Sequence, residues 1–389
     1  MKGRLIHISE DEKFINSANS QFEAAFENKN FFHIFKNNDD SELKYVLLEE
    51  NVKIINSLEG VNKLLSTINK EDVVIFHSLS PRFISFINSL PKEIKTVWLC
   101  FGFEIYNDKN FFSVDILYDK ITKKTFTYKE PIWIKIKIFL NKFYKIFLEH
   151  KEDNSQKLKA KAIERIDYLA CSFEEEFNLV SKLIGQKKFF FPFWYYPLER
   201  IVDVNTNAKI IRNDILIGNS GTKTNNHLDI FKKIEHYNLN DRNVIVPLSY
   251  GDKMYIDHIM VKGRETFKDF FLPLDTFYNI EDYNNIIMSC GVAIFNNRRQ
   301  QAVGNILALL WFGSKVFLSC KSTFYAFLKS LSIHVYSFEN DLNENSINVL
   351  LNDKEIVQNR VVLKRVLSSE MLNQQLKQTI DSLLLDNYK

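Results

Sequence analysis

The chain has 389 residues, of which 46% are hydrophobic and 25% are charged, and its formal net charge at pH 7 is +3. This length suits two domains of ordinary size with substantial cores. So small a net charge gives no support to a nucleic-acid partner. The N-terminal segment has only a short apolar stretch before acidic residues, and no run of about 18 uncharged apolar residues occurs, so we expect neither a signal peptide nor a membrane span.

The chain offers little that would bind a metal or a cofactor. Its four cysteines are far apart and form no CxxC pair; they are Cys100, Cys171, Cys290 and Cys320. Their apolar surroundings are typical of buried thiols in a reducing cytoplasm. The sequence contains no metal-ligand cluster, no GxSxG motif and no paired-carboxylate signature. We therefore expect a protein that uses no metal and no cofactor.

The first half of the chain alternates apolar strands with helical stretches. Strands are predicted at 4–8, 73–76, 96–101 and 168–172. Strands that alternate with helices are typical of parallel βαβ units, in which crossover helices cover both faces of a sheet.

A second series of the same kind begins after Pro197. Its strands are predicted at 215–217, 244–248, 270–272, 291–295, 315–318 and 334–336, and a final amphipathic helix is predicted from about Ser369. The polar stretch 197–212 separates the two series. We therefore expect an α/β protein with two Rossmann-like, doubly wound domains facing a central cleft. The predicted boundaries are 1–200 for the N-terminal domain, 201–368 for the C-terminal domain and 369–389 for a helix that packs back on the N-terminal domain.

A basic segment, residues 119–151, interrupts the first series. It holds nine lysines against three acidic residues, and its second part is rich in aromatic side chains. A basic amphipathic helix of this kind is able to lie in the interface of an anionic membrane. The alternative is a core helix whose lysines form its solvated side, and residues 133–139 also alternate like a strand. We expect this segment to belong to the N-terminal domain and to contact a membrane surface.

Polar loops at the predicted strand ends are the candidate binding sites, because ligands of open parallel sheets bind beyond the carboxyl ends of the strands. Residues 218–227 (GNSGTKTNNH) join a strand to a helix, where small residues and helix amides favour phosphate. This loop has neither Walker A nor GxGxxG glycine spacing, and its asparagines are also suited to capping the helix.

Two further loops have the same position in the second series. Residues 298–305 (RRQQAVGN) precede an apolar helix, and their arginines and helix amides suit a diphosphate, although a structural loop with solvent-facing arginines is the alternative. Residues 249–252 (SYGD) offer a tyrosine that suits stacking on a base or sugar, or they form a simple turn.

In the first half, His77 and Glu104 follow predicted strands. An imidazole or a carboxylate at such a position suits a general base acting on an acceptor hydroxyl. His7 is a further candidate, with a buried structural role as its alternative.

The motifs GNSGTKTNNH, LSYGD and RQQAVG, in this order and spacing, resemble glycosyltransferase family 56, the TDP-4-acetamido-4,6-dideoxygalactose:lipid II transferases, also labelled 4-alpha-L-fucosyltransferases. The resemblance extends to GFEIY at 102–106, where the family tends to have Gly-x-Asp-x-Tyr, so that Glu104 stands in place of Asp. Together these motifs span most of residues 70–340.

The resemblance implies a GT-B glycosyltransferase of enterobacterial common antigen-like polysaccharide synthesis. The donor, a nucleotide-diphosphate sugar such as TDP-4-acetamido-4,6-dideoxygalactose (TDP-Fuc4NAc), would bind the C-terminal domain. The acceptor, a polyprenyl-diphosphate-linked saccharide, would bind the N-terminal domain at the cytoplasmic face of the inner membrane. The implied donor-binding residues are Gly218, Asn219, Ser220, Asn225, Tyr250, Gly251, Arg299, Gln300, Gln301 and Gly304. From their positions after predicted strands, we expect Glu104 or His77 to be the catalytic residue that deprotonates the acceptor. The alternatives are a GT-B transferase that uses a UDP- or GDP-sugar on another glycan and a non-catalytic α/β binding protein.

Overall fold

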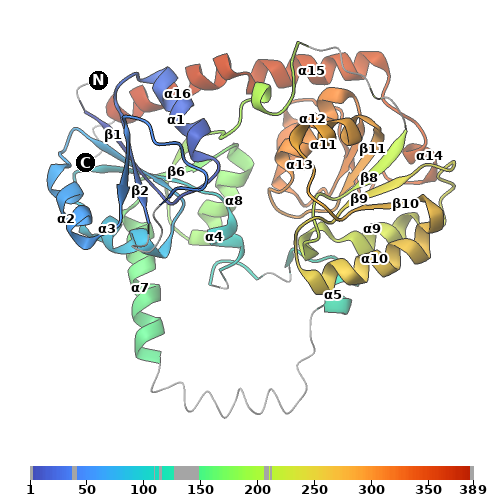
Figure 1. Ribbon diagram of the computed structural model, residues 1–389, viewed down its shortest axis with the longest axis horizontal. Coiled ribbons are helices and arrows are strands. Elements are labelled where there is room, and N and C mark those ends of the chain that lie inside the picture. The colour runs from blue at the N-terminus through green and yellow to red at the C-terminus, as the bar shows by residue number, and fades with distance from the viewer. Residues whose placement is uncertain are drawn as a thin grey trace. The chain divides into compact units, whose positions relative to one another are not determined.

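The computed structural model describes residues 3–36, 42–108, 110–113, 116–126, 149–205, 210 and 213–385, with the backbone alone at 149–154 and 280. These residues form two compact units (Figure 1). The first unit holds the described residues up to 111, together with 149–195 and 370–385. The second unit holds the described residues of 112–126 and 196–369.

The first unit is built on a parallel sheet of seven described strands, in the order β3-β2-β1-β4-β5-β6-β7. The strands are β1 (Leu5–Ser9), β2 (Asn30–Phe35), β3 (Val52–Ile55), β4 (Val73–His77), β5 (Lys95–Leu99), β6 (Tyr168–Cys171) and β7 (Phe189–Pro192). Every residue of β1 and β4 is buried, as expected for a parallel sheet that is covered on both faces. Four of these strands, β1, β4, β5 and β6, confirm the sequence prediction within about two residues, whereas β2, β3 and β7 were not predicted.

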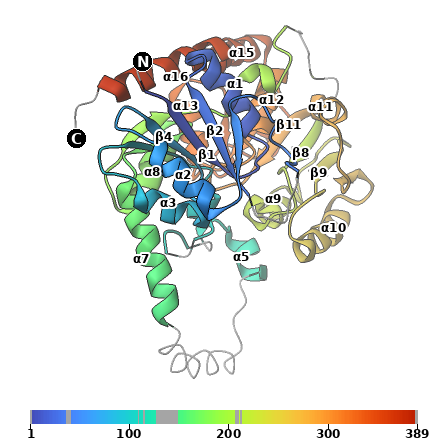
Figure 2. The same cartoon turned by 60° about the vertical axis from the view of Figure 1, so that its left-hand side comes forward.

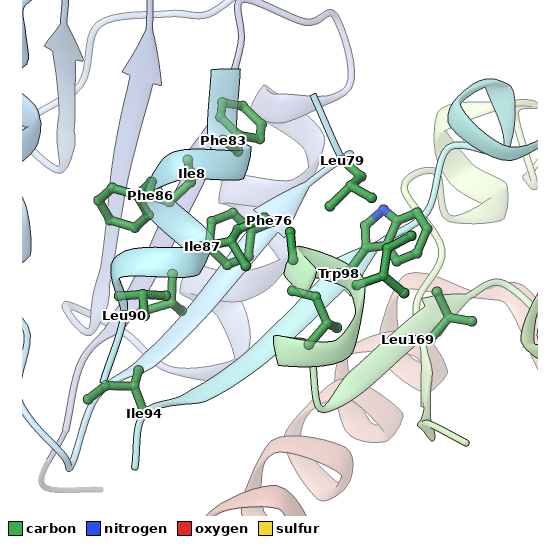
Figure 3. Packing of buried hydrophobic residues seen from close by; sticks show 14 of the residues in the cluster. Ile8, Phe76, Leu79, Phe83, Phe86, Ile87, Leu90, Ile94, Trp98 and Leu169 are labelled. Carbon is green, nitrogen blue, oxygen red and sulfur yellow. The ribbon is translucent and has the colours of Figure 1, made fainter. Parts of the chain in front are cut away.

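Alternate residues of these strands face two different helix layers. Val74 and Phe76 of β4 belong to a core that includes Phe83, Phe86 and other residues of one helix layer. Figure 3 shows these aromatic rings and Trp98 among the buried hydrophobic side chains of this core. This layer consists of α2 (Leu58–Thr67), η1 (Pro81–Phe83), α3 (Ile84–Ser89), the end of α7 (Glu149–Arg165) and α8 (Glu174–Ile184).

The other face of the same sheet is covered by α1 (Ile15–Ala25) and by the C-terminal helix α16 (Ser369–Leu385). Leu376 and Ile380 of α16 share a core with Phe22 of α1 and Ile75 of β4. The ammonium group of Lys95 also donates to the carbonyl of Leu383 at 2.5 Å, near the end of α16. The last helix of the chain therefore completes the core of the first unit.

The second unit is built on a parallel sheet of six described strands, in the order β10-β9-β8-β11-β12-β13. The strands are β8 (Asp214–Ile217), β9 (Val244–Pro247), β10 (Phe271–Leu274), β11 (Cys290–Phe295), β12 (Lys315–Leu318) and β13 (Tyr336–Ser337). All six predicted strands of this half are confirmed, with small shifts in their bounds. Strand β10 includes Pro273, which is tolerated because β10 is the edge strand.

Helices also cover both faces of this second sheet, as Figure 2 and Figure 1 show. The helical elements of the unit are η3 (Leu198–Arg200), η4 (Lys223–Asn225), α9 (His227–Ile234), α10 (Lys253–Phe267), η5 (Lys268–Phe270), α11 (Ile280–Met288), α12 (Val303–Phe312), α13 (Thr323–Ser330), α14 (Glu344–Ile347) and α15 (Asp353–Leu367). Ile230 of α9 and Ile259 of α10 pack in one core with Ile215, Val246 and Ile294 of the strands.

One segment of the first half belongs to the second unit. We expected residues 119–151 to lie with the N-terminal domain, but α5 (Lys120–Phe126) packs on α9. The N-terminus of α5 is held by Asp229, whose carboxylate accepts from the N–H of Ile121 (2.7 Å) and from the N–H (2.9 Å) and Oγ1 (2.7 Å) of Thr122. An acidic residue at a helix N-terminus is stabilising, and these contacts fix α5 to the second unit. Most of the remaining basic segment, 127–148, lies outside the described residues.

Candidate active site

The loop after β8 is folded around a buried asparagine. Asn225 has no exposed surface, and its Nδ2 donates to the carbonyl of Ser220 (2.7 Å) and to Oγ1 of Thr222 (3.0 Å). Its Oδ1 accepts from the backbone N–H of Asn219 at 3.3 Å. We expected Asn225 and Ser220 to approach a donor, but Ser220 is also buried and the Asn225 amide is engaged inside the loop. Both residues therefore shape the loop from within.

Two glycines allow this loop to close against its neighbours. Gly218 has a φ of +69°, and a Cβ at this position would lie 2.6 Å from Nε2 of His227. Gly251 has a φ of +141°, and a Cβ there would lie 2.2 Å from the carbonyl oxygen of Gly221. Gly221 in turn donates its N–H to the carbonyl of Tyr250 at 2.7 Å. A side chain at Gly251 would push the loops after β8 and β9 apart, and a side chain at Gly218 would collide with His227 at the start of α9.

Gln301 joins the loop after β11 to the loop after β8. Its Nε2 donates to Oδ1 of Asn219 (3.1 Å) and to Oγ1 of Thr222 (3.2 Å). Its Oε1 accepts from Oγ1 of Thr224 (2.7 Å) and from Nε of Arg299 (3.2 Å). Gln301 therefore fixes the Arg299 side chain relative to the loop after β8. The half-buried Gln300 lies between Arg299 and Gln301.

The N-terminus of α12 is open at this place. Ala302, the residue before the helix, has a φ of +59°, and its carbonyl accepts from the N–H of Ile306 at 2.9 Å. Gly304 is exposed, and a Cβ built on it would meet no atom within 4 Å. The first-turn N–H groups and the helix dipole make such a terminus suited to an anion, with Arg299 nearby in the sequence.

Tyr250 lies beside this loop cluster. Its hydroxyl accepts from Nδ2 of Asn219 at 3.3 Å, and 48% of the residue is exposed. Asp252 caps α10 by accepting from the N–H of Tyr255 (3.0 Å), and its carboxylate pairs with Lys223 at 2.9 Å. The Ser-Tyr-Gly-Asp sequence is therefore a turn and helix cap that also presents an exposed aromatic ring.

The neighbouring Arg298 is occupied by a structural role that the sequence did not reveal. Its guanidinium pairs with Asp119 at 2.6 Å and donates to the carbonyls of Ile116 (3.2 Å) and Tyr118 (2.9 Å). Burial opposes ionisation of Asp119, but hydrogen bonds from Asn296 and Lys120 N–H, together with Arg298, lower its pKa below the ordinary value. Of the two adjacent arginines, Arg298 is thus committed to holding the segment before α5.

In the first unit, Glu104 occupies the start of α4 (Phe103–Tyr106). Its Oε1 accepts from Nε1 of Trp98 (3.1 Å) and from the N–H of Phe101 (3.1 Å). Its Oε2 is buried and has no hydrogen-bond partner among the described residues. Burial raises the pKa of Glu104, which is 6% exposed, because the charged form loses its hydration. Tyr106, from the same motif, donates to Glu176 at 2.7 Å.

His77 lies at the end of β4 in a buried network of the first unit. One ring nitrogen, Nε2, is 3.0 Å from Nδ1 of His7, and the other, Nδ1, is 2.9 Å from the hydroxyl of Tyr195. Burial lowers the pKa of His77 to about 3 and that of His7 well below its ordinary value. Both ring nitrogens of His77 are thus engaged within the unit.

Neither a metal cluster nor a membrane span occurs in the part of the chain that the structure describes. No group of three or more His, Cys, Asp or Glu side chains there is arranged to hold a metal ion. Likewise, none of the described helices is long and apolar enough to cross a membrane.

The loops of the second unit described above lie within a part of the chain that matches a known sequence family. Residues 175–364 match the sequence model of the family described as 4-alpha-L-fucosyltransferase glycosyl transferase group 56. This match confirms the resemblance inferred from the three second-half motifs, all of which it includes. The Gly-Phe-Glu-Ile-Tyr motif at 102–106 lies outside the matched residues.

Solved structures of GT-B glycosyltransferases share the fold. Sucrose-phosphate synthase from Thermosynechococcus elongatus matches with a TM-score of 0.64 and 9% identity over 99% of this chain and 100% of that one. A UDP-forming alpha,alpha-trehalose-phosphate synthase from Burkholderia xenovorans, in complex with glucose-6-phosphate, matches with a TM-score of 0.59 and 10% identity over 99% and 100%. Anabaena HepE in complex with UDP matches with a TM-score of 0.61 and 9% identity over 97% and 100%. The fold is therefore GT-B, and with the family match the chain is a glycosyltransferase.

Proposed function

We propose that this glycosyltransferase transfers a 4-acetamido-4,6-dideoxyhexose from its TDP carrier to a polyprenyl-diphosphate-linked saccharide during synthesis of a surface polysaccharide. The group 56 match supports the deoxyhexose, because the matched residues include the three loops of the candidate donor site. The observation that carries the proposal is the Gln301 junction, which sets Arg299 beside the loop after β8 near the open start of α12.

The donor diphosphate would bind in the second unit. Arg299 supplies a forked cation, and the first turn of α12 at Gly304 supplies N–H groups and the positive end of a dipole. Both stabilise the negative charge that grows on the diphosphate as the sugar leaves. Asn219, which is hydrogen-bonded to Gln301, would line the same site, whereas the buried Gly218, Ser220 and Asn225 would support the loop that carries it.

We assign deprotonation of the acceptor hydroxyl to the first unit, and we favour Glu104 over His77 as the base. The oxygen of an acceptor hydroxyl forms a bond to the anomeric carbon, and its proton passes to the Glu104 carboxylate. The bond from that carbon to the diphosphate breaks, and the diphosphate leaves with the electron pair. Glu104 has a buried carboxylate oxygen that is unpaired among the described residues, and its pKa is raised; both features suit a base, whereas both nitrogens of His77 already have partners.

Attachment to the cytoplasmic face of the inner membrane is part of the same proposal. Nine lysines in residues 119–151 would attract an anionic lipid surface, at about 1 kcal/mol for each residue close to it. Helix α7, which begins within the last residues of this segment, extends away from the rest of the first unit in both views (Figure 1, Figure 2).

A panel of nucleotide sugars tests the donor assignment. Wild-type protein is heated with TDP-, UDP- and GDP-sugars, and the rise in Tm and the release of nucleoside diphosphate are measured. A ligand at 100 times its Kd stabilises the folded state by about 2.7 kcal/mol. We expect the TDP-deoxyhexose to give the largest rise. If UDP- or GDP-sugars gave the largest rise, the proposed donor would be wrong but the enzyme class would stand. If no nucleotide sugar raised the Tm or released a nucleoside diphosphate, the proposal would be contradicted.

A further inference from the structure

Two aromatic rings stand exposed and parallel at the carboxyl end of the second sheet. Tyr250 follows β9 and Phe277 follows β10, and these two strands are neighbours. The rings are parallel within 10°, with their centroids 6.1 Å apart. Tyr250 is 48% exposed and Phe277 is 79% exposed, so most of the Phe277 surface faces water.

This exposed aromatic surface lies beside the candidate binding site and is suited to contact a ligand. Single exposed apolar residues are common on protein surfaces and need no explanation. Here, however, two rings from different loops are aligned, and one is tied to the donor loops. The Tyr250 hydroxyl accepts from Nδ2 of Asn219 at 3.3 Å, while Oδ1 of Asn219 accepts from Gln301 at 3.1 Å. The aromatic pair is therefore an extension of the same loop network.

The strand order fixes where the pair lies relative to the anion-binding groups. Strands β10, β9, β8 and β11 are consecutive in the sheet. Their loops carry Phe277, Tyr250, Asn219 and Arg299 in that order. Neighbouring strands are roughly 4.8 Å apart, so the aromatic loops lie about two to three strand spacings, roughly 10–15 Å, from the arginine loop. A nucleotide, which carries a flat base at about this distance from its phosphates, fits this arrangement.

We propose that Tyr250 and Phe277 form the stacking surface for the nucleobase of the donor. This inference rests on the proposed function and adds the subsite that would hold the base, with Phe277 as a residue that the sequence motifs did not include. Stacking needs only a π face, so the pair provides affinity for any nucleobase. Discrimination among bases then falls to the polar groups around the ring edges.

The test is calorimetric binding of TDP, UDP, GDP and inorganic pyrophosphate to wild-type protein, Phe277→Ala and Phe277→Trp. Loss of base stacking weakens binding by about 5- to 150-fold. We expect Phe277→Ala to weaken the binding of nucleoside diphosphates by about tenfold and to leave the binding of pyrophosphate unchanged. Phe277→Trp should bind nucleoside diphosphates as wild type does. Tyr250→Phe, which keeps the ring and removes the hydroxyl, separates stacking from the contact with Asn219.

The matched control is Phe270→Ala. Phe270 immediately precedes β10 and is 40% exposed, so it is an exposed phenylalanine at the opposite end of the same strand. We expect this variant to bind every probe as wild type does. Wild-type affinity of Phe277→Ala for nucleotides, or an equal loss for pyrophosphate, would overturn the stacking surface alone. Failure of wild-type protein to bind any nucleoside diphosphate would overturn the proposed function as well.

Discussion

Arg298 and Asp119, far apart in the sequence, form an ion pair of 2.6 Å in which both side chains are mostly shielded from water. The pair joins the segment before α5 to the loop that carries Arg299. Asn296 donates to the other carboxylate oxygen of Asp119 at 3.0 Å, so the same carboxylate holds two positions of that loop. Asp119 is thereby a positioning residue for the candidate donor site.

Asp119→Asn should therefore destabilise the second unit and disturb the loop. The amide keeps hydrogen-bonding capacity but loses the charge opposite Arg298, so we expect a loss of about 1–3 kcal/mol in the free energy of unfolding, measured with urea. Nucleotide binding should weaken as Arg299 becomes less fixed. Glu265→Gln is the control, because its pair with Lys262 is exposed and should contribute less than about 0.5 kcal/mol. Equal stability of the two variants would contradict the role given to Asp119.

Gly251 and Gly304 should respond differently to the same substitution. Gly251→Ala places a Cβ 2.2 Å from a backbone oxygen at a positive φ, so we expect it to destabilise the protein by roughly 2–4 kcal/mol. Gly304→Ala meets no atom, and in a helix it should leave Tm unchanged or raise it slightly.

Pyrophosphate binding tests the role of Gly304 separately from its effect on stability. If the diphosphate lies against the first turn of α12, the methyl group of Gly304→Ala fills part of its space and weakens pyrophosphate binding although the fold is intact. Calorimetry on that variant checks this point. Undiminished pyrophosphate affinity in Gly304→Ala would place the diphosphate elsewhere.

Glu104→Gln should stabilise the protein at neutral pH and abolish transfer. Folding raises the pKa of Glu104 above its ordinary value of 4.5, so between these two values the folded state binds more protons than the unfolded chain. Stability of the wild type therefore falls as pH rises through this window. The variant lacks this dependence, so its advantage in urea unfolding should be present above the window and vanish below about pH 4.5.

The same variant tests the catalytic assignment when it is compared with His77→Gln. Removal of a general base typically costs 10²–10⁴ in rate, and we expect that loss in Glu104→Gln. His77→Gln, assayed per folded molecule, should retain transfer because His77 acts within a buried network. The reverse pattern would assign the base to His77.

Much of the fold could be predicted because parallel strands buried on both faces form short apolar runs. The runs at β4 and β11 are of this kind and were recognised. Strand β3 was missed because it is an edge strand whose four residues include only one buried side chain, so its pattern is weak. The move of α5 to the second unit depends on contacts with Asp229 and Arg298, which no local pattern reveals.

Some parts of the candidate site could be predicted from the sequence and others could not, for similar reasons. Glycine-rich and arginine-rich loops at strand ends predict a nucleotide site, and the loops containing Gly218, Tyr250 and Arg299 follow the neighbouring strands β8, β9 and β11. Which side chains point outward depends on tertiary packing. Asn225 is turned inward because five polar atoms around it need partners, and Phe277 follows an edge strand without any motif.

The transfer reaction itself tests the proposed donor, the proposed acceptor and the role of Arg299 together. Purified protein is incubated with TDP-4-acetamido-4,6-dideoxygalactose and a polyprenyl-diphosphate-linked saccharide, and the lipid product is analysed by mass spectrometry. Arg299→Ala is compared with Arg264→Ala, which changes an exposed arginine of α10 in the same unit. We predict that the acceptor gains one deoxyhexose residue with wild type and Arg264→Ala, and at least about 100-fold more slowly with Arg299→Ala. An acceptor that gains no sugar from wild-type protein, or equal rates for the two arginine variants, would contradict the account.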